Sequence, residues 1–539
     1  MKRELLPKKV TDSKDVLYED NIFRDNSMQT PVQIGVEYDE SKLFVHIKKD
    51  GYVLLDFGKE LSGGVRISIQ DVSDKCGKIR IKFGESAMEA MTEIGVKNLD
   101  NYHSVIEYTI PALSLSSQRI GDTGFRFVKL EAMDTDIVLR TVKAVFETCD
   151  AKELGRFECN DDMINDIWNT AVYTVKLNMN DYLTEGLKRD RLVWIGDIHP
   201  EVSTVRTVFG KNAVVERSLD FVRDNTPSDK WMNNTGTYSM WWIIVHYDWY
   251  MHWGDLNYLK RQIECLKSVC ELAFEWIENG LGDKEDKMVN FVDWSSKGTD
   301  SEFEGRKSIF CMGMDAASKL FEILNEERLA QKCQKYRDML QSEKILKEYN
   351  KRVSALTILS GRDSEIAKKV IGGNSAKNMS TFLGYYVLKA KALCRDYRDS
   401  LEIIRKYWGG MLKKGATTFW EDFDIDWMCG SGRIDEITPD GLKDIHGDFG
   451  RYCYKGFRHS LCHGWASGPA PYLMEQIGGI EILEPGCKKI KITPNLGGLE
   501  WIKITYPTPY GPVKIESSIS NGEQIKTKID APKEIEIIQ

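Results

Sequence analysis

Four short segments of the chain place a carboxylate or a histidine beside tryptophan. They are TEGLKRDRLVWIGDIHPE at 184–201, FVDWSSKG at 291–298, KKGATTFWEDFD at 413–424 and FRHSLCHGWASGPAPYL at 457–473. Two carboxyl groups can cleave a glycosidic bond, because one protonates the leaving oxygen while the other activates water or attacks the sugar. Aromatic rings offer flat apolar surfaces for the C–H faces of a sugar. The segments therefore predict a site that binds or cleaves a glycoside.

Asp190 and Glu421 are the candidates for the two carboxyl groups. Asp190 lies among three cations in the run LKRDR, and cations favour the ionised form of a carboxyl group. An acid role for Asp190 therefore requires burial or a nearby carboxylate, such as Asp197, that raises its pKa. Glu421 follows Trp420 in a Gly-Ala-Thr-Thr loop, a setting suited to an ionised carboxylate beside a bound water.

The same residues also have ordinary structural explanations. Asp190 could be an ion-pair partner of a neighbouring arginine, and Asp197 could cap the helix that follows it. Glu421 could be a solvated charge, and His463 a core histidine. The basic run at 188–191 is also what a phosphate or nucleic-acid patch would use. Spacing alone leaves sugar binding and sugar cleavage both open.

Three regions with different periodicity must position these segments. Alternating apolar and polar runs, with Gly51, Gly63–Gly64 and Gly77 as expected turns, predict an N-terminal β-sandwich. The centre is helical; its first helix buries one apolar face and begins after Asn160 or Asp161. Short proline-broken strands return after Gly486. The predicted boundaries are an N-terminal extension at 1–30, a β-sandwich at 31–152, a helical domain at 153–478 and a C-terminal β-domain at 479–539.

Composition limits the function classes. A chain of 539 residues requires two to four domains, and a net charge of -8 argues against a dedicated nucleic-acid binder. No run approaches the roughly 18 apolar residues of a membrane span, and no apolar stretch follows the basic N-terminus as in a secretory signal. The 12 cysteines form no CxxC pair, which favours reduced thiols over zinc ligands or disulfides. We expect a cytoplasmic protein without a membrane or nucleic-acid partner.

The four segments, in this order, resemble the bacterial α-L-rhamnosidases of glycoside hydrolase family 78. The second half of that family's first motif matches Arg191, Trp194, Gly196 and Asp197. Its Gly-Asp-Trp segment is similar to residues 292–294, its Ala-Thr-Thr-x-Trp-Glu segment to 416–421, and its Ser-Leu-Asn-His segment to 460–463. The flanking β-regions are similar as well, so the resemblance covers about residues 50 to 520.

The resemblance implies a multidomain α and β protein with a central (α/α)6 barrel of the six-hairpin glycosidase type, flanked by the two β-domains. It implies hydrolysis of a terminal α-L-rhamnoside, or a related sugar, with inversion and with neither a metal nor another cofactor. Asp190 would be the general acid and Glu421 the general base. The residues that would line the sugar site are Glu185, Arg191, Trp194, Asp197, Asp293, Trp294, Trp420, His463 and Trp465.

The chain departs from the family pattern at several positions. The family's first aspartate falls on Thr184, with Glu185 beside it, and the acid is an aspartate where the family usually has glutamate. A usual sugar-stacking tryptophan is missing between the second and third segments, where Tyr385 or Tyr386 could substitute. Two alternatives therefore stay open: a non-catalytic carbohydrate-binding protein and an inverting glycoside phosphorylase. The expected partner is a carbohydrate, and the sequence also leaves a homodimer open.

Overall fold

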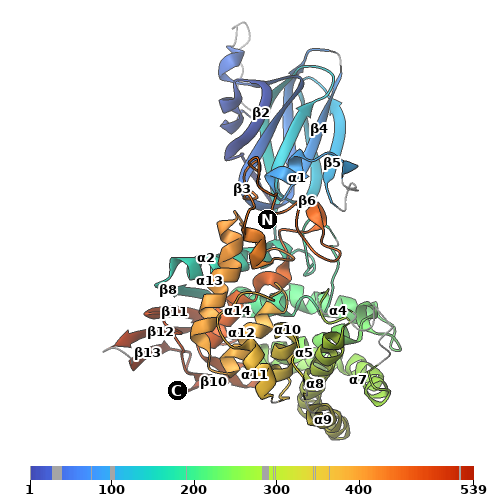
Figure 1. Ribbon diagram of the computed structural model, residues 1–539, viewed down its shortest axis with the longest axis vertical. Helices are drawn as coiled ribbons and strands as arrows, with labels where there is room; N and C mark the ends of the chain where they lie inside the picture. Colours follow the sequence, from blue (N-terminus) through green and yellow to red (C-terminus); the bar gives the residue numbers. More distant parts are fainter. Residues whose placement is uncertain are drawn as a thin grey trace. The chain divides into compact units, whose positions relative to one another are not determined.

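The structure is a computed structural model that divides into two compact units (Figure 1). It describes residues 2–26, 39–74, 76–96, 104–189, 191–281, 291–294, 297, 299–343, 345, 347–362, 364–520 and 524–539. We call one unit the sandwich unit; it consists of Met1–Asp150, Gly186–Arg191 and Met411–His463. We call the other the helical unit; it consists of Ala151–Glu185, Leu192–Gly410 and Gly464–Gln539.

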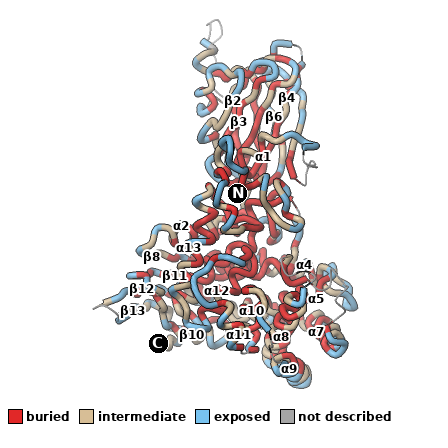
Figure 2. Tube along the Cα trace, viewed as in Figure 1, coloured by how far each residue is buried: buried red, intermediate tan, exposed pale blue. Residues whose placement is uncertain are grey.

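The sandwich unit contains a seven-stranded antiparallel sheet in the order β1-β7-β3-β6-β4-β5, with β2 paired to β3. Its strands are β1 (Lys2–Leu5), β2 (Lys9–Leu17), β3 (Val45–Val72), β4 (Gly77–Gly84), β5 (Ile106–Ala112), β6 (Ser116–Ala132) and β7 (Ile137–Glu147). Residues 45–47 and 69–72, from the two ends of β3, both pair with residues 137–139 of β7. The sheet therefore folds over its own buried aliphatic and aromatic side chains, as the red trace of β3 and β6 shows (Figure 2). The predicted β-sandwich is confirmed.

Two features of this sheet differ from the expectations. Gly51, Gly63 and Gly64, all expected in turns, lie inside β3. Gly63 has a φ of 136°, and a Cβ added to it would lie 2.1 Å from the carbonyl oxygen of Val145, so the close approach of the two strands requires glycine. Strands β1 and β2 come from the predicted N-terminal extension and pair with β7 and β3.

Residues 411–463 belong to the sandwich unit, although they fall within the predicted helical domain. They are mostly irregular, with short 3-10 turns at Ile425–Met428 and Gly456–Arg458. They pack against the turn after β4, where the helix α1 (Ala87–Met91) begins. The amide of Ala87 donates to the carbonyl of Ile434 over 2.9 Å. Such contacts join parts of the chain that no local sequence pattern connects.

The first helix of the helical unit is α2, whose first turn follows the sequence prediction. The Asp161 side chain accepts a hydrogen bond from the amide of Ile164, so Asp161 is the N-cap. The longer helices are α2 (Asp162–Asn178), α4 (Ala213–Asp224), α5 (Gly236–Trp253), α7 (Ile263–Glu278), α8 (Asp300–Ile323), α9 (Glu327–Ser342), α10 (Lys351–Leu359), α12 (Gly384–Leu393) and α13 (Tyr397–Lys413). The shorter ones are α3 (His199–Thr204), α6 (Leu256–Arg261), α11 (Glu365–Ile371) and α14 (Pro469–Tyr472). None among the described residues is long and apolar enough to cross a membrane.

Two small sheets complete the helical unit. One has the order β14-β10-β9 and the other β13-β12-β11-β8. Their strands are β8 (Arg156–Cys159), β9 (Ile480–Glu484), β10 (Lys489–Ile492), β11 (Trp501–Tyr506), β12 (Val513–Ser520), β13 (Gln524–Asp530) and β14 (Glu536–Ile538). β8 precedes α2 in the chain and pairs antiparallel with β11. Among the described residues of 155–475 the structure contains no parallel sheet, as the helical prediction requires.

Candidate active site

Glu421 is the centre of a buried polar cluster in the sandwich unit. Its side chain is 4% exposed, and its Oε2 accepts hydrogen bonds from the Nη2 of Arg189 over 2.6 Å and from the amide of Ser460 over 2.9 Å. The amide of Glu421 donates to the carbonyl of Ser460 over 2.9 Å. Its other oxygen, Oε1, lies 3.7 Å from the Nε2 of His463. The solvated-charge interpretation is therefore wrong, because the carboxyl group is fixed inside the protein.

The charge state of this pair follows from its burial. Burial raises the pKa of Glu421 above its usual value, although Arg189 and the Ser460 amide act in the opposite direction. Burial also holds the pKa of His463 well below 6.5, so this imidazole is neutral at neutral pH. A carboxylate whose pKa is moved toward the working pH is suited to accept a proton. The position of Glu421 therefore fits a general base.

Lys188 is a second buried cation near this carboxylate. Its Nζ lies 3.1 Å from Glu85 Oε2 and 3.2 Å from Glu89 Oε1, and it donates to the carbonyls of Phe457 (2.6 Å) and His459 (3.1 Å). Burial lowers the pKa of Lys188, but Glu89 and Glu85 outweigh this effect, so its pKa lies above the usual value. Lys188 is therefore charged and bound to the backbone of the fourth motif.

Glu85 connects this network to Glu421. It accepts from the Oγ of Ser460 over 3.0 Å and from the amide of Leu461 over 2.8 Å. Ser460 is the residue whose amide holds Glu421, so Glu85 fixes the segment that fixes the carboxylate. The sequence offers one local signal, a capping box in which the Ser86 side chain accepts from the Glu89 amide. That signal locates α1 but gives no role to Glu85, which was missed.

The basic run of the first motif is fully engaged with carboxylates. Arg189 pairs with Glu421, as described above. Arg191 has its Nη1 3.3 Å from Asp122 Oδ2, and its Nε donates to the carbonyl of Leu187 over 2.8 Å. These cations are not arranged as a phosphate or nucleic-acid patch. Asp190, the predicted general acid, lies outside the described residues, so its role stays a prediction.

Asp197 occupies a polar position in the helical unit. The hydroxyl of Tyr238 donates to its Oδ1 over 2.6 Å. Asp197 does not cap the next helix, since α3 has Ile198 at its N-cap and no side-chain capping bond. Burial, followed by the charges of Asp197, Glu185 and Asp293, holds the pKa of Tyr238 well above its usual value. Tyr238, which the sequence reasoning missed, thus brings three of the predicted site residues into one electrostatic cluster.

A series of aromatic contacts connects Tyr238 to Trp194 and Trp294, two of the predicted tryptophans. Trp194 meets Tyr238 edge to face at 6.2 Å, Phe291 meets Tyr238 at 5.9 Å, and Trp294 meets Phe291 at 5.2 Å. Trp194 and Trp294 are each only half-buried and so keep some ring surface for a sugar, with the Nζ of Lys297 4.6 Å from the centre of the Trp294 ring. The structure therefore groups Trp194, Asp197, Asp293 and Trp294, although they come from two separate motifs.

The other aromatic candidates are buried. Trp420 is 1% exposed and meets Phe423 edge to face at 5.6 Å. Trp465 is 4% exposed and stacks on Phe382 at 5.3 Å. Tyr385 and Tyr386, the proposed substitutes for a stacking tryptophan, are buried as well. A sugar cannot stack on rings that other side chains already cover.

Glu201, the last residue of the first motif, is a second buried carboxyl that was not singled out. It is 0% exposed, and neither oxygen has a hydrogen-bond partner among the described residues. A Cβ added to Gly464 would lie 2.1 Å from its Cδ, so glycine is required at that position. Burial, together with Asp197, raises the pKa of Glu201 well above its usual value. Burial therefore favours the protonated form of Glu201.

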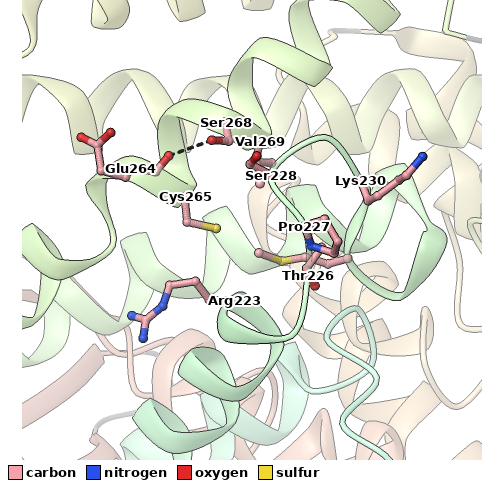
Figure 3. A pocket seen from close by; sticks show the side chains of 10 residues that line it. Arg223, Thr226, Pro227, Ser228, Lys230, Glu264, Cys265, Ser268 and Val269 are labelled. Atoms are coloured by element: carbon pink, nitrogen blue, oxygen red, sulfur yellow. Dashed lines mark hydrogen bonds between the residues drawn. The ribbon is translucent and has the colours of Figure 1, made fainter.

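Two other features of the chain could be mistaken for functional sites. Glu85, Glu89 and His446 are close enough to ligate a metal ion, but Lys188 already supplies the positive charge beside both carboxyl groups. The pocket in Figure 3 lies between the end of α4 and α7 and measures about 170 Å³, below the volume typical of ligand sites. Burial raises the pKa of Cys265 in that pocket to about 11, so the thiol is protonated at neutral pH.

Three family models match successive parts of the chain. They describe the concanavalin-like domain of bacterial alpha-L-rhamnosidase at 46–147, its six hairpin glycosidase domain at 152–355 and its C-terminal domain at 479–537. All three belong to one family, follow one another in order and together match about two thirds of the chain. The chain belongs to the bacterial α-L-rhamnosidase family. The six-hairpin fold expected for its centre is therefore confirmed, and so is the family resemblance that rests on the four motifs.

Individual relatives are distant. An alpha-L-rhamnosidase of Formosa agariphila is 21% identical over 88% of this chain and 54% of its own length, and one of Streptomyces avermitilis is 21% identical over 92% and 49%. The GH78 family rhamnosidase of Bacillus sp. GL1 superimposes with a TM-score of 0.73 at 19% identity, covering 96% of this chain and 55% of that one. The chain thus spans about half the length of the curated relatives it matches.

Proposed function

We propose that this member of the bacterial α-L-rhamnosidase family is an inverting glycoside hydrolase that releases terminal α-L-rhamnose or a closely related sugar. The observation that carries the proposal is the setting of Glu421. Its carboxylate is buried, one oxygen is fixed by Arg189 and the Ser460 amide, and the other lies beside neutral His463. This arrangement supports a general base, since Oε1 lies beside an imidazole that carries no charge.

In the proposed mechanism Glu421 takes a proton from water, and the water oxygen bonds to the anomeric carbon. The bond from that carbon to the leaving oxygen breaks, and Asp190 supplies the proton that the leaving oxygen needs. An inverting enzyme holds its two carboxyl groups about 6.5–9.5 Å apart to admit the water. We expect this wider class for Asp190 and Glu421.

In the helical unit we propose that Trp194 and Trp294 stack on the sugar while Asp197 and Asp293 bind its hydroxyl groups. The half-buried rings and the Tyr238 hydrogen bond to Asp197 support these roles. Rhamnose as the sugar is supported by the family and by a Klebsiella oxytoca rhamnosidase solved with rhamnose bound. That structure covers 88% of this chain and 95% of its own, with a TM-score of 0.67 at 17% identity.

The test is hydrolysis of 4-nitrophenyl α-L-rhamnopyranoside, compared with a panel of other aryl glycosides. Proton NMR of the first-formed sugar should show the anomer opposite to that of the substrate. The same anomer would refute inversion, and cleavage of another glycoside but not the rhamnoside would refute the sugar assignment. Turnover that requires phosphate would indicate a phosphorylase, and binding without turnover would indicate a carbohydrate-binding protein.

A further inference from the structure

A half-buried tryptophan lies between two hollows in the helical unit. Trp501 begins β11, in the four-stranded sheet β13-β12-β11-β8. On the side of β8 and α2 it borders a hollow of about 620 Å³, and on the side of β12 and β13 one of about 320 Å³. Both volumes fall within the range typical of ligand sites. We call this region, the two hollows with Trp501 between them, the Trp501 face.

The larger hollow is lined by groups that can bind hydroxyls. Trp168 of α2 lines it and is 4% exposed, and its indole N–H has no acceptor among the residues that the structure describes. A buried N–H without a partner is costly, so a small shift of the ring that brings a ligand oxygen within hydrogen-bond distance would be favourable. Asn169, the next residue of α2, is exposed and also lines the hollow, as do the acidic residues Glu158 and Asp162 and one cation, Arg156, which pairs with Glu158.

The smaller hollow has the opposite charge balance. Lys503, Lys526 and Lys528 line it together with Glu516. The Nζ of Lys503 lies 5.6 Å from the centre of the Trp501 ring. The face therefore carries mainly acids at one end and mainly lysines at the other, with an aromatic ring between them. A strongly anionic or cationic polymer would meet like charges at one end.

We propose that the Trp501 face is a second carbohydrate-binding site that takes a neutral oligosaccharide chain. One sugar stacks on Trp501, and its neighbours extend into the two hollows. Hydroxyl groups both donate and accept, so they can bond to the carboxylates, to the lysines and to the indole N–H of Trp168. Binding at this site involves no bond cleavage, so it does not depend on the proposed hydrolysis.

The experiment is affinity gel electrophoresis of the full chain with soluble polysaccharides in the gel. Glu421→Gln serves as the parent background, so that the polymer is not degraded during the run. A neutral rhamnan is the probe, and polygalacturonate is the charged comparison. Trp501→Ala removes the stacking ring. Asn169→Arg places a long side chain across the larger hollow beside Glu158 and Asp162, from an exposed position outside the core. Tyr510→Ala is the matched control, since Tyr510 is 38% exposed and lines neither hollow.

We expect the rhamnan to retard the parent and the Tyr510→Ala variant equally. Trp501→Ala and Asn169→Arg should each weaken the apparent affinity by about tenfold or more, the size typical of losing a central aromatic contact or blocking its pocket. Unchanged retardation of both variants would overturn the proposal. Retardation of the parent by polygalacturonate alone would overturn it too, because the attraction would then be electrostatic. In chains that retain Glu421, hydrolysis of the small aryl rhamnoside should be unaffected by either variant, which separates this site from the proposed catalytic one.

Discussion

Replacing Arg189 by methionine tests the assignment of Glu421 as the base. The Arg189 guanidinium and the Glu421 carboxylate are 6% and 4% exposed and lie 2.6 Å apart. Arg189 lowers the pKa of Glu421, against the stronger effect of burial. Methionine keeps an apolar stem of similar length but removes the positive charge. The carboxyl group should then ionise only at a higher pH.

The size of the shift follows from the bond that is lost. A buried hydrogen bond to a charged group contributes about 1.5–3 kcal/mol, and 1.36 kcal/mol corresponds to one pKa unit. The pKa of Glu421 should therefore rise by about 1 to 2 units. Since the folded-state pKa of this acid already lies above its usual value, the variant should also lose stability increasingly as the pH rises through that range.

The assay is the pH dependence of kcat/KM for 4-nitrophenyl α-L-rhamnopyranoside, whose acid limb reports the base of the free enzyme. The limb should move upward by about 1 to 2 pH units in Arg189→Met. Arg191→Met is the matched control from the same motif. Its ion pair with Asp122 joins side chains that are 35% and 65% exposed, and such pairs contribute little.

An acid limb of Arg189→Met that superimposes on that of the parent, in a folded and active variant, would show that Glu421 is not the titrating base. An equal shift in Arg191→Met would show that the general loss of positive charge, and not the bond to Glu421, moves the limb.

Four further predictions address the same network. Glu421→Gln keeps the shape of the base but cannot accept the proton, so turnover should fall by a factor on the order of 100 to 10,000 in the aryl glycoside assay. Asp190→Asn should be equally harmful for a substrate with a poor leaving group and milder for a nitrophenolate; parent rates on both would exclude Asp190 as the acid and favour Glu185. Glu85→Gln should lower kcat more than it raises KM and should move the acid limb of the pH profile, because it loosens the segment that holds Glu421; a pure loss of thermal stability would refute this. Glu201→Met should raise the free energy of unfolding, and the gain should grow by about 1.4 kcal/mol per pH unit above the usual glutamate pKa until the folded-state pKa is reached, because the folded state binds the extra proton. Urea unfolding at pH 5 and pH 8 measures it, and an equal gain at both would contradict it.

The sequence predicts features that depend on local periodicity and capping. The helix that begins after Asp161 buries the expected face, and the alternating strands before residue 150 form the expected sandwich. Between α6 and α7 the amide of Gln262 donates to the carbonyl of Leu259, three residues earlier, which interrupts the α-helical pattern. Such small breaks cost little and leave no clear sequence signal.

Contacts between distant segments could not be predicted in the same way. Glu85 and Ser460 are 375 positions apart, and β8 meets a strand from the far end of the chain. In the sequence, Glu85 is a single acidic residue, and nothing in the neighbouring residues distinguishes it from a solvated charge. The four segments contain Glu421 and the two residues that hold it, Arg189 and Ser460, but not Glu85, which lies outside all of them.

The arrangement around Glu421 explains why an acidic chain concentrates cations in LKRDR. A buried carboxylate must have charged or hydrogen-bonding partners, or it takes up a proton and no longer acts as a base at neutral pH. Arg189 satisfies Glu421 directly. Lys188 pairs with Glu85, and Glu85 accepts from Ser460, whose amide donates to the Glu421 carboxylate. Arg189 and Lys188 are adjacent in the chain and support Glu421 in two ways. Arg189 bonds to the carboxylate directly, and Lys188 acts through Glu85 and Ser460, so the same basic run sets both the charge and the rigidity of the base.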